Sequence, residues 1–209
     1  MPSSGLLYEA MELPRGTELF TVVGKDWPTP HEGYANRGPA RFSPIAADDG
    51  SIATTLYAGP SPRCALGETV FRDLCGGASV NRRRLEERAM LRTETLRELI
   101  LADLRPVAAR AAGAEFYDQD LGTTIGMWPV SQYQRSAELG SRIYRDTETH
   151  WDGICWESRQ APPDNAYLIF TDRVDLRVSL NPEPLISPAW LAHVGALAAQ
   201  LRILLPSEL

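Results

Sequence analysis

The sequence is poor in the residues that build disulfide frameworks and metal centres. It contains three cysteines and three histidines among 209 residues, with no CxxC pair and no HxxxH pair. An odd number of cysteines without CxxC spacing indicates neither a disulfide framework nor a zinc site. We therefore expect no metal cofactor, and we interpret the histidines as structural or surface residues.

Long apolar runs and an excess of positive charge are also missing. No stretch is long enough to span a membrane, and the first residues lack the basic and apolar regions of a secretion signal. The formal net charge of -6 argues against nonspecific binding to nucleic acids or to anionic membranes as the main activity. We expect a cytoplasmic protein in which locally placed arginines hold any anionic ligand.

The common nucleotide-binding and hydrolase motifs do not occur. There is no GxGxxG, no GxxxxGK[ST] and no GxSxG segment, which argues against a usual dinucleotide-binding fold, a P-loop and a serine hydrolase of the common type. Ser158 lies in the segment ESR without a nearby histidine. It is therefore not expected to act as a nucleophile.

The most informative stretch that is present is residues 61–74, SPRCALGETVFRDL. Ser61 suits the N-cap of a helix and Pro62 its first position, and we expect this helix to continue until Gly76. At helical spacing Glu68 lies among apolar neighbours. Because an unpaired buried carboxylate is costly, Glu68 should lie in a cleft or meet a cation or hydrogen-bond donors. A structural ion pair with an arginine is the simplest of these interpretations.

Periodic patterns elsewhere predict a mixed sheet with flanking helices, which is an α+β fold in one domain. We expect residues 1–16 to be a loosely ordered leader and residues 17–209 to form the domain. The predicted strands cover residues 17–23, 53–58, 153–156, 166–170 and 174–180, and the predicted helices cover residues 131–145 and 187–204.

Two segments are harder to assign. Residues 82–105 contain strong helix formers, so propensity favours a helix, although part of the segment alternates as a buried strand does. Residues 27–44 are rich in glycine, proline and asparagine and predict a long irregular loop. The aromatic residues in this loop favour a functional role for it.

Three polar residues carry the chemistry that the sequence suggests: Arg41, Glu68 and Ser158. A guanidinium binds phosphate as a fork, a carboxylate accepts ribose hydroxyls or stabilises an oxocarbenium charge, and a hydroxyl fixes orientation. If the three side chains converge, they suit an anionic ligand that contains a sugar.

The setting of these residues resembles a known family. The segments NRGPARFSP, TLYAGPSPRCALGETVFRD and WDGICWESRQAPPDNAYLIF, in this order, are similar to the RES domain family, which is named for its arginine, glutamate and serine. The resemblance runs from about Arg37 to Phe170 and depends on the three segments together. It implies a core similar to that of ADP-ribosyltransferases, and it favours strands over residues 88–104.

The resemblance implies that Arg41, Glu68 and Ser158 are the three name-giving residues, and that Tyr57 lines the same pocket. RES proteins are typically toxins of bacterial toxin–antitoxin pairs that consume NAD. NAD is thus the expected substrate, and cleavage of its nicotinamide N-glycosidic bond is the expected reaction. Arg41 would anchor the diphosphate, Tyr57 would pack on a ring, Ser158 would orient the ribose, and Glu68 would stabilise the oxocarbenium-like transition state.

The acceptor of the ADP-ribosyl group stays open at this point. Water makes the protein a hydrolase, inorganic phosphate makes it a phosphorylase, and a protein side chain makes it an ADP-ribosyltransferase. A non-catalytic module that binds NAD and acts through a partner is a further alternative. The resemblance also implies a partner, an Xre-type helix-turn-helix antitoxin whose C-terminal end blocks the pocket.

Each candidate residue also has a simpler interpretation. Arg41 could form a surface ion pair, Tyr57 could be a core aromatic residue rather than a stacking platform for nicotinamide or adenine, and Ser158 could cap the turn after its strand. Arg37 and Arg159 are weaker candidates for contacts to the pyrophosphate, and the simplest interpretation places both on the surface.

Overall fold

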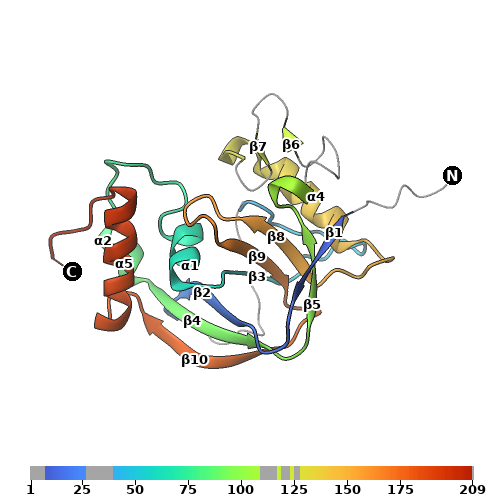
Figure 1. Ribbon diagram of the computed structural model, residues 1–209, viewed down its shortest axis with the longest axis horizontal. Helices are drawn as coiled ribbons and strands as arrows, with labels where there is room; N and C mark the ends of the chain where they lie inside the picture. The colour runs from blue at the N-terminus through green and yellow to red at the C-terminus, as the bar shows by residue number, and fades with distance from the viewer. Residues whose placement is uncertain (1–7, 27–39, 109–116, 119–122, 125–127, 209) are drawn as a thin grey trace.

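Two β-sheets carry the fold in the computed structural model, which describes residues 8–26, 40–108, 117–118, 123–124 and 128–208 (Figure 1). The five-stranded sheet has the order β1-β5-β8-β9-β3. Its β5 and β8 are parallel, and the other neighbours are antiparallel. The strands are β1 (Glu9–Leu13), β5 (Leu99–Asp103), β8 (Gly153–Glu157), β9 (Asn165–Phe170) and β3 (Thr55–Ala58).

The second sheet is antiparallel and has the order β10-β4-β2. A bridge between Phe20 and Gly59 joins its β2 to the end of β3, so the two sheets meet there. The strands are β10 (Leu176–Pro184), β4 (Arg88–Thr95) and β2 (Glu18–Gly24), and a separate pair is formed by β6 (Tyr117–Asp118) and β7 (Thr123–Thr124).

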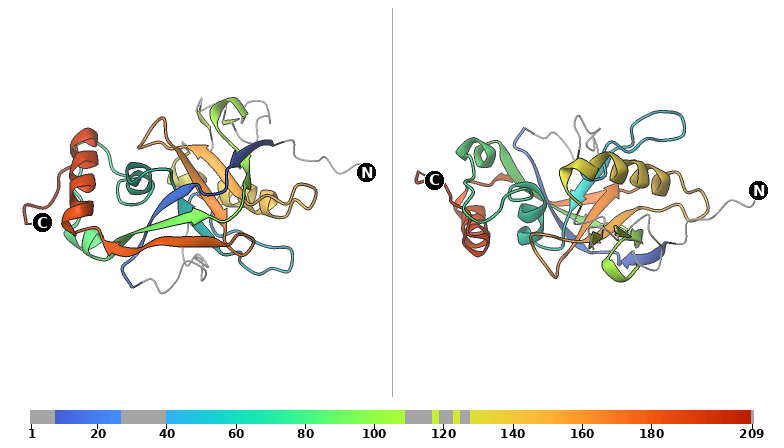
Figure 2. Two further views of the ribbon diagram at one scale, coloured as in Figure 1. Left: turned by 60° about the horizontal axis from the view of Figure 1, so that its bottom comes forward. Right: turned by 90° about the horizontal axis from the view of Figure 1, so that it is seen from above.

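The longest helices lie at opposite ends of the molecule, with the shorter helix α1 between them (Figures 1 and 2). Helix α1 contacts β2, β3 and β9 as well as α5. Within the described ranges, no helix is both long and apolar enough to cross a membrane. The helices are α1 (Pro62–Thr69), α2 (Arg82–Glu86), α4 (Tyr133–Tyr144) and α5 (Pro188–Leu201), and the turn Val130–Gln132 precedes α4.

This architecture confirms the predicted α+β class. Strands and helices form at the positions predicted for β2, β3, β8, β9, α4 and α5, within a few residues at their ends. The helix that propensity favours over residues 82–105 is wrong except for its first turn, α2, because the segment continues as β4 and β5. The strands expected over residues 88–104 from the family resemblance are present.

The leader prediction is wrong for residues 9–13. These residues form β1 and pair in antiparallel register with β5, from Glu9 opposite Asp103 to Leu13 opposite Leu99. Only Leu13 in β1 is buried, so the strand shows little apolar alternation. Its hydrogen-bond partners come from a segment about ninety residues later, which no local pattern reveals.

Helix α1 begins where the sequence predicts and ends earlier. Ser61 is its N-cap, and the Ser61 Oγ accepts a hydrogen bond of 3.0 Å from the backbone N–H of Cys64. The helix stops at Thr69, so its predicted continuation to Gly76 is wrong. The carbonyl groups of the following turn are bonded by the side chain of Gln160 instead of by a further helical turn.

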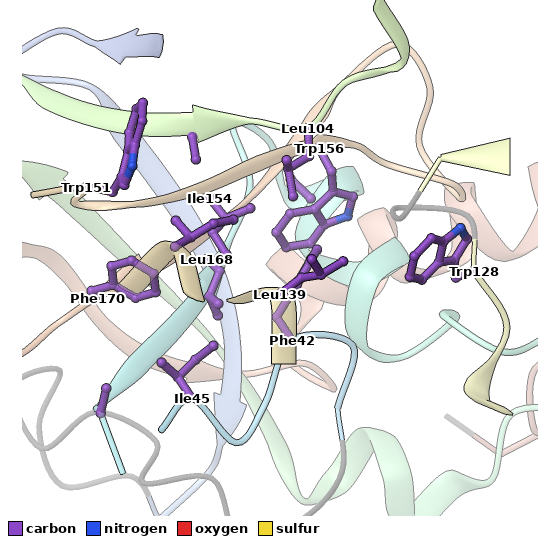
Figure 3. Close-up of a cluster of buried hydrophobic side chains, with 14 of the residues drawn as sticks. Phe42, Ile45, Leu104, Trp128, Leu139, Trp151, Ile154, Trp156, Leu168 and Phe170 are labelled. Atoms are coloured by element: carbon purple, nitrogen blue, oxygen red, sulfur yellow. The ribbon is translucent and has the colours of Figure 1, made fainter. Parts of the chain in front are cut away.

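In the largest apolar cluster, the segment around Arg41 packs against the five-stranded sheet. Phe42 is fully buried, and its ring lies 5.0 Å from that of Trp156 on β8, measured between centroids. Figure 3 shows this pair together with Leu139 of α4, which belongs to the same buried cluster. Burial of Phe42 therefore fixes the backbone on which the preceding arginine is carried.

Candidate active site

A cleft of about 220 Å³ opens where β2, β3 and α1 meet the start of β4. Its walls combine apolar side chains with one carboxylate and two guanidinium groups. The residues that line it are Thr21, Val22, Ala40, Leu56, Tyr57, Glu68, Thr69, Arg72 and Arg88. A mixed lining of this kind is typical of a site that binds a polar ligand with aromatic or sugar parts.

Glu68 lines this cleft, and the buried Ser158, which is not among the described lining residues, contacts the Glu68 carboxylate. Glu68 belongs to the last turn of α1, and Ser158 follows directly after β8. The Ser158 Oγ donates a hydrogen bond of 2.7 Å to Glu68 Oε1. The exposed fraction is 9% for Glu68 and 1% for Ser158. The carboxylate is thus held at the edge of the interior, with one oxygen already bonded.

Hydrogen bonds to Asp164 link the loop after β8 to the start of α1. The carbonyl of Asp164 accepts the backbone N–H of Ser158 at 2.9 Å, and its Oδ2 accepts the hydroxyl of the N-cap residue Ser61 at 2.6 Å. Gly59, which follows β3, lies close against α1, because a Cβ there would lie 2.6 Å from the Sγ of Cys64. The same loop therefore sets the start of α1 and the position of its partner serine.

Gln160 on this loop holds the other end of α1. Its Nε2 donates to the carbonyls of Phe71, Arg72 and Leu74 at 3.0, 3.1 and 3.1 Å. Gly67 lies directly against this side chain, because a Cβ at that position would be 3.1 Å from the Cβ of Gln160. Two residues of one loop, Ser158 and Gln160, thus position both the carboxylate and the turn that follows it.

Arg41 lies in the interior behind the cleft, and its neighbour Ala40 lines the cleft wall. The Arg41 Nη1 donates a hydrogen bond of 3.2 Å to the carbonyl of Trp128. The guanidinium carbon lies 5.7 Å from the ring centroid of Tyr133, and the hydroxyl of Ser136 donates to the Arg41 carbonyl. These contacts make Arg41 a buried cation, so a simple surface ion pair is excluded for it.

The environment of Arg41 acts on its pKa in opposing directions. Burial lowers the pKa of Arg41 and is the largest effect, while the negative charge of Glu68 raises it. The positive charge of Arg72 lowers the pKa of Arg41 further. The intrinsic pKa of a guanidinium is so high that Arg41 stays charged. Glu68 is therefore placed in the field of a buried cation.

Tyr57 contributes its ring to the cleft and its hydroxyl to the backbone that carries Arg41. The hydroxyl accepts the backbone N–H of Phe42 at 3.0 Å and lies 3.3 Å from the Oγ of Ser43. Its ring packs edge-on against Trp156, with centroids 6.1 Å apart. Burial raises the pKa of the Tyr57 phenol, so it is neutral at physiological pH. Tyr57 is half-buried and serves as both a core aromatic and a cleft wall.

Two further arginines, Arg37 and Arg159, are the weaker candidates for contacts to the pyrophosphate. Arg37 lies outside the described residues. Arg159 is exposed on the loop after β8 and is not among the described residues that line the cleft. The sequence reasoning missed Arg72 and Arg88, which do line it. A helix continued to Gly76 would have put Arg72 on the same side as Glu68, but the chain leaves the helix at Thr69, so the spacing alone does not locate Arg72.

The cavity has no grouped metal ligands near it. In the described ranges, no three histidine, cysteine, aspartate or glutamate side chains gather closely enough to hold a metal ion. The arrangement offers a carboxylate, a hydroxyl, an aromatic wall and several cations. These groups can bind an anionic sugar-containing ligand and stabilise positive charge that develops on its sugar ring.

The chain is similar to known proteins in sequence and in fold. The family model of the RES domain matches residues 18–190. No curated protein matches the sequence. A chain of the crystal structure of the M. tuberculosis MbcT-MbcA toxin-antitoxin complex has a similar fold, with a TM-score of 0.56 and 14% identity over 91% of both chains.

Proposed function

Because the chain belongs to the RES domain family, we propose that it degrades NAD by cleaving the N-glycosidic bond between nicotinamide and ribose. The observation that carries the proposal is the contact between Glu68 and Ser158. A buried serine hydroxyl donates to a carboxylate that lines a cleft of suitable polarity, beside the ring of Tyr57. We propose that the ribose of the substrate binds beside this negative charge.

The reaction requires stabilisation of a positive charge on the ribose. When the bond from C1′ to the nicotinamide nitrogen breaks, its electron pair leaves with nicotinamide, which becomes neutral. The ribose carbon is left with oxocarbenium character, and the Glu68 carboxylate stabilises this charge and binds a ribose hydroxyl. The acceptor then forms the new bond at C1′ and loses its proton to solvent. The scheme needs no metal, because the leaving group is already neutral.

The other three candidate residues, Ser158, Tyr57 and Arg41, support this step. Ser158 holds Glu68 through the bond of 2.7 Å and orients the nicotinamide ribose. The ring of Tyr57 packs on a ring of the substrate, while its hydroxyl stays bonded to the backbone of Phe42. Arg41 supplies positive charge for the diphosphate from the interior side of the cleft. The catalytic residues we propose are Arg41, Glu68 and Ser158, and these three with Tyr57 bind NAD.

We also propose that the chain is the toxin of a toxin–antitoxin pair and that it acts in the cytoplasm. The similarity in fold to a chain of a toxin–antitoxin complex supports this role. Its partner is an Xre-type helix-turn-helix antitoxin whose C-terminal end enters the cleft and excludes NAD. A gene for such a protein next to the gene of this chain is the expected arrangement, and co-purification of the two proteins tests it.

The decisive experiment is NAD consumption by the purified chain, with and without inorganic phosphate, beside Glu68→Gln and Arg41→Ala. We expect NAD loss by the wild type and its disappearance in both variants. ADP-ribose as the product identifies water as the acceptor, and a phosphorylated ADP-ribose that requires added phosphate identifies phosphorolysis. Labelled ADP-ribose on a protein identifies a transferase. Binding without any turnover contradicts the catalytic proposal and leaves an NAD-binding module.

A further inference from the structure

We propose that Arg72 is a second diphosphate-binding residue of this cleft, and that the edge of its guanidinium formed by Nε and Nη2 binds the phosphate oxygens of NAD. The proposal rests on the function proposed above, because it names the group that meets one part of that substrate. It concerns a residue outside the arginine, glutamate and serine that give the family its name.

The position of Arg72 relative to Glu68 suits this role. Both residues line the same cleft, and Arg72 belongs to the turn that follows α1. In NAD, the diphosphate is joined to the nicotinamide ribose through one methylene carbon. A ligand whose ribose meets Glu68 therefore carries its diphosphate to a neighbouring part of the cleft wall. Arg72 presents a cation in that neighbourhood.

Two hydrogen-bond donors of the Arg72 guanidinium have no acceptor among the described residues, which indicates a binding site for a ligand. Within the part of the chain that the structure describes, Nε and Nη2 are shielded from water and have no hydrogen-bond partner. These two nitrogens form one edge of the guanidinium, and their N–H groups point in parallel. This is the geometry of a fork that binds two oxygens of one phosphate. Leaving charged donors buried and unbonded is costly, and an anionic ligand would remove that cost.

Arg72 is held in place by groups other than a carboxylate. Its guanidinium carbon lies 4.8 Å from the ring centroid of Tyr133, and its backbone carbonyl accepts a hydrogen bond of 3.1 Å from Gln160 Nε2. Stacking on an aromatic ring and a bonded backbone restrict the side chain without using the Nε and Nη2 edge. The guanidinium is therefore already largely ordered, and binding of a phosphate requires only a local movement that opens the shielded Nε and Nη2 edge to the cleft.

Charge around the cleft favours an anion as the ligand. Arg72 and Arg41 approach the ring of Tyr133 at 4.8 and 5.7 Å, and Arg88 also lines the cleft. Burial lowers the pKa of Arg84, and the positive charges of Arg88 and Arg72 lower it further, while the negative charge of Asp73 raises it. Glu68 is the single carboxylate among the described lining residues. This local excess of positive charge lies in a chain whose net charge is -6.

Arg41 and Arg72 lie at different depths relative to the cleft wall. Arg41 is 2% exposed and donates to the carbonyl of Trp128, so it acts from behind the wall. Arg72 is partly exposed and belongs to the wall itself. A diphosphate has two phosphate groups, and the fork of Arg72 would contact one of them directly. Its removal should therefore weaken binding of phosphate-containing ligands specifically.

The test measures the binding of ADP-ribose by calorimetry and the turnover of NAD at steady state. Nicotinamide riboside, which lacks phosphate, is the comparison ligand. We expect Arg72→Gln to weaken ADP-ribose binding about ten- to hundredfold and to raise the KM for NAD, with nicotinamide riboside unaffected. Arg72→Lys keeps the charge and loses the fork, so we expect an intermediate affinity. Thermal unfolding of each variant shows whether it is folded.

A matched control is Arg177→Gln. Arg177 is an exposed arginine on β10 that pairs with Glu94, and Glu94 lies six residues along β4 from Arg88, roughly 20 Å away. We expect this variant to bind ADP-ribose as the wild type does. Inorganic pyrophosphate provides a second measurement on the unmodified chain, because it should compete with ADP-ribose for the fork.

The outcomes separate this inference from the proposed function. If the wild type turns over NAD and Arg72→Gln binds ADP-ribose with unchanged affinity, the inference is overturned and the proposed function stands. Equal weakening of ADP-ribose and nicotinamide riboside also overturns it, because it indicates a purely structural role. If the variants do not fold, an absence of competition by pyrophosphate overturns it on the wild type alone. A folded wild type that binds neither NAD nor ADP-ribose overturns both proposals.

Discussion

The hydroxyl of Ser158 lies 2.7 Å from Oε1 of Glu68, although the two residues are 90 positions apart in the chain. This contact joins the last turn of α1 to the end of β8 at the cleft. It holds a carboxylate that is 9% exposed in one orientation. The loop that carries Ser158 also carries Gln160, which bonds the turn after α1.

The first prediction concerns the charge of Glu68. Glu68→Gln keeps the size of the side chain and an acceptor for the Ser158 hydroxyl, but it removes the negative charge that stabilises the oxocarbenium-like state. We expect kcat for NAD to fall about hundredfold or more, with the melting temperature nearly unchanged. Turnover measured by loss of NAD, together with thermal unfolding, checks this. Retention of most of the activity would remove Glu68 from the mechanism.

The second prediction concerns the orientation of that carboxylate. Ser158→Ala removes the bond of 2.7 Å to Glu68 Oε1 and leaves the carboxylate free to rotate. We expect kcat to fall about tenfold, which corresponds to the loss of one hydrogen bond to a charged group. Ser187→Ala is the matched control, because Ser187 precedes α5 and its hydroxyl has no hydrogen-bond partner in the described residues. Equal activity of the two variants would contradict this role.

The third prediction concerns the turn after α1. Gln160→Ala removes the Nε2 donor that contacts three backbone carbonyls. The carbonyl of Phe71 keeps the backbone N–H of Leu74, while those of Arg72 and Leu74 lose the Gln160 donor. We expect the free energy of unfolding to fall by about 1 to 3 kcal/mol, because buried acceptors lose their partner. Urea denaturation monitored by circular dichroism measures the change. Arg159→Ala, which alters the exposed neighbouring residue, should leave the free energy of unfolding within about 0.5 kcal/mol of the wild type.

The fourth prediction concerns the packing of β8 against β9. A Cβ added at Gly153 would lie 2.2 Å from the backbone carbonyl oxygen of Leu168, which cannot move without breaking the strand pairing. We expect Gly153→Ala to lower the free energy of unfolding by about 3 kcal/mol or more. Gly195→Ala in α5 is the control, because a Cβ there meets no atom within 4 Å. It should stabilise the helix slightly, by up to about 1 kcal/mol. Equal stability of both variants would contradict the strand contact.

The fifth prediction concerns alkaline pH. Burial raises the pKa of the Cys155 thiol to about 12 and also raises the pKa of the Cys64 thiol. An unfolded thiol titrates near about 8.5. Between these values the folded state binds more protons than the unfolded state, so stability falls as pH rises. The expected slope is about 1.4 kcal/mol per pH unit for each thiol.

Urea denaturation from pH 7.5 to 10 measures this decline. The double variant Cys64→Ala/Cys155→Ala should show a shallower dependence on pH than the wild type. Cys75 is exposed and is the control, since Cys75→Ala should keep the slope of the wild type. The same slope in the double variant and in the wild type would show that the buried thiols do not contribute.

Local patterns predicted much of the fold and part of the site. The alternation in β2 and β9 and the N-cap at Ser61 identify their elements, because strand period and helix capping are properties of neighbouring residues. The spacing of Glu68 among apolar residues predicted that its carboxylate would lie in a cleft or meet a cation or hydrogen-bond donors, and it lines the cleft and accepts the Ser158 hydroxyl. Its bonding partner could not be predicted from the helix alone, because the hydroxyl comes from the loop after β8.

Only the tertiary structure decided how these elements are paired and which arginine side chain lines the cleft. Residues of β4 and β5 include strong helix formers, yet they form strands because β2, β10, β1 and β8 supply their hydrogen bonds. Arg41 points into the interior toward the carbonyl of Trp128, and Arg72 lines the cleft. The sequence by itself determined which side chains carry charge and which segments repeat with the period of a helix or a strand. Contacts between distant segments determined the rest, because the burial and hydrogen bonding of a side chain depend on residues that only the folded chain brings next to it.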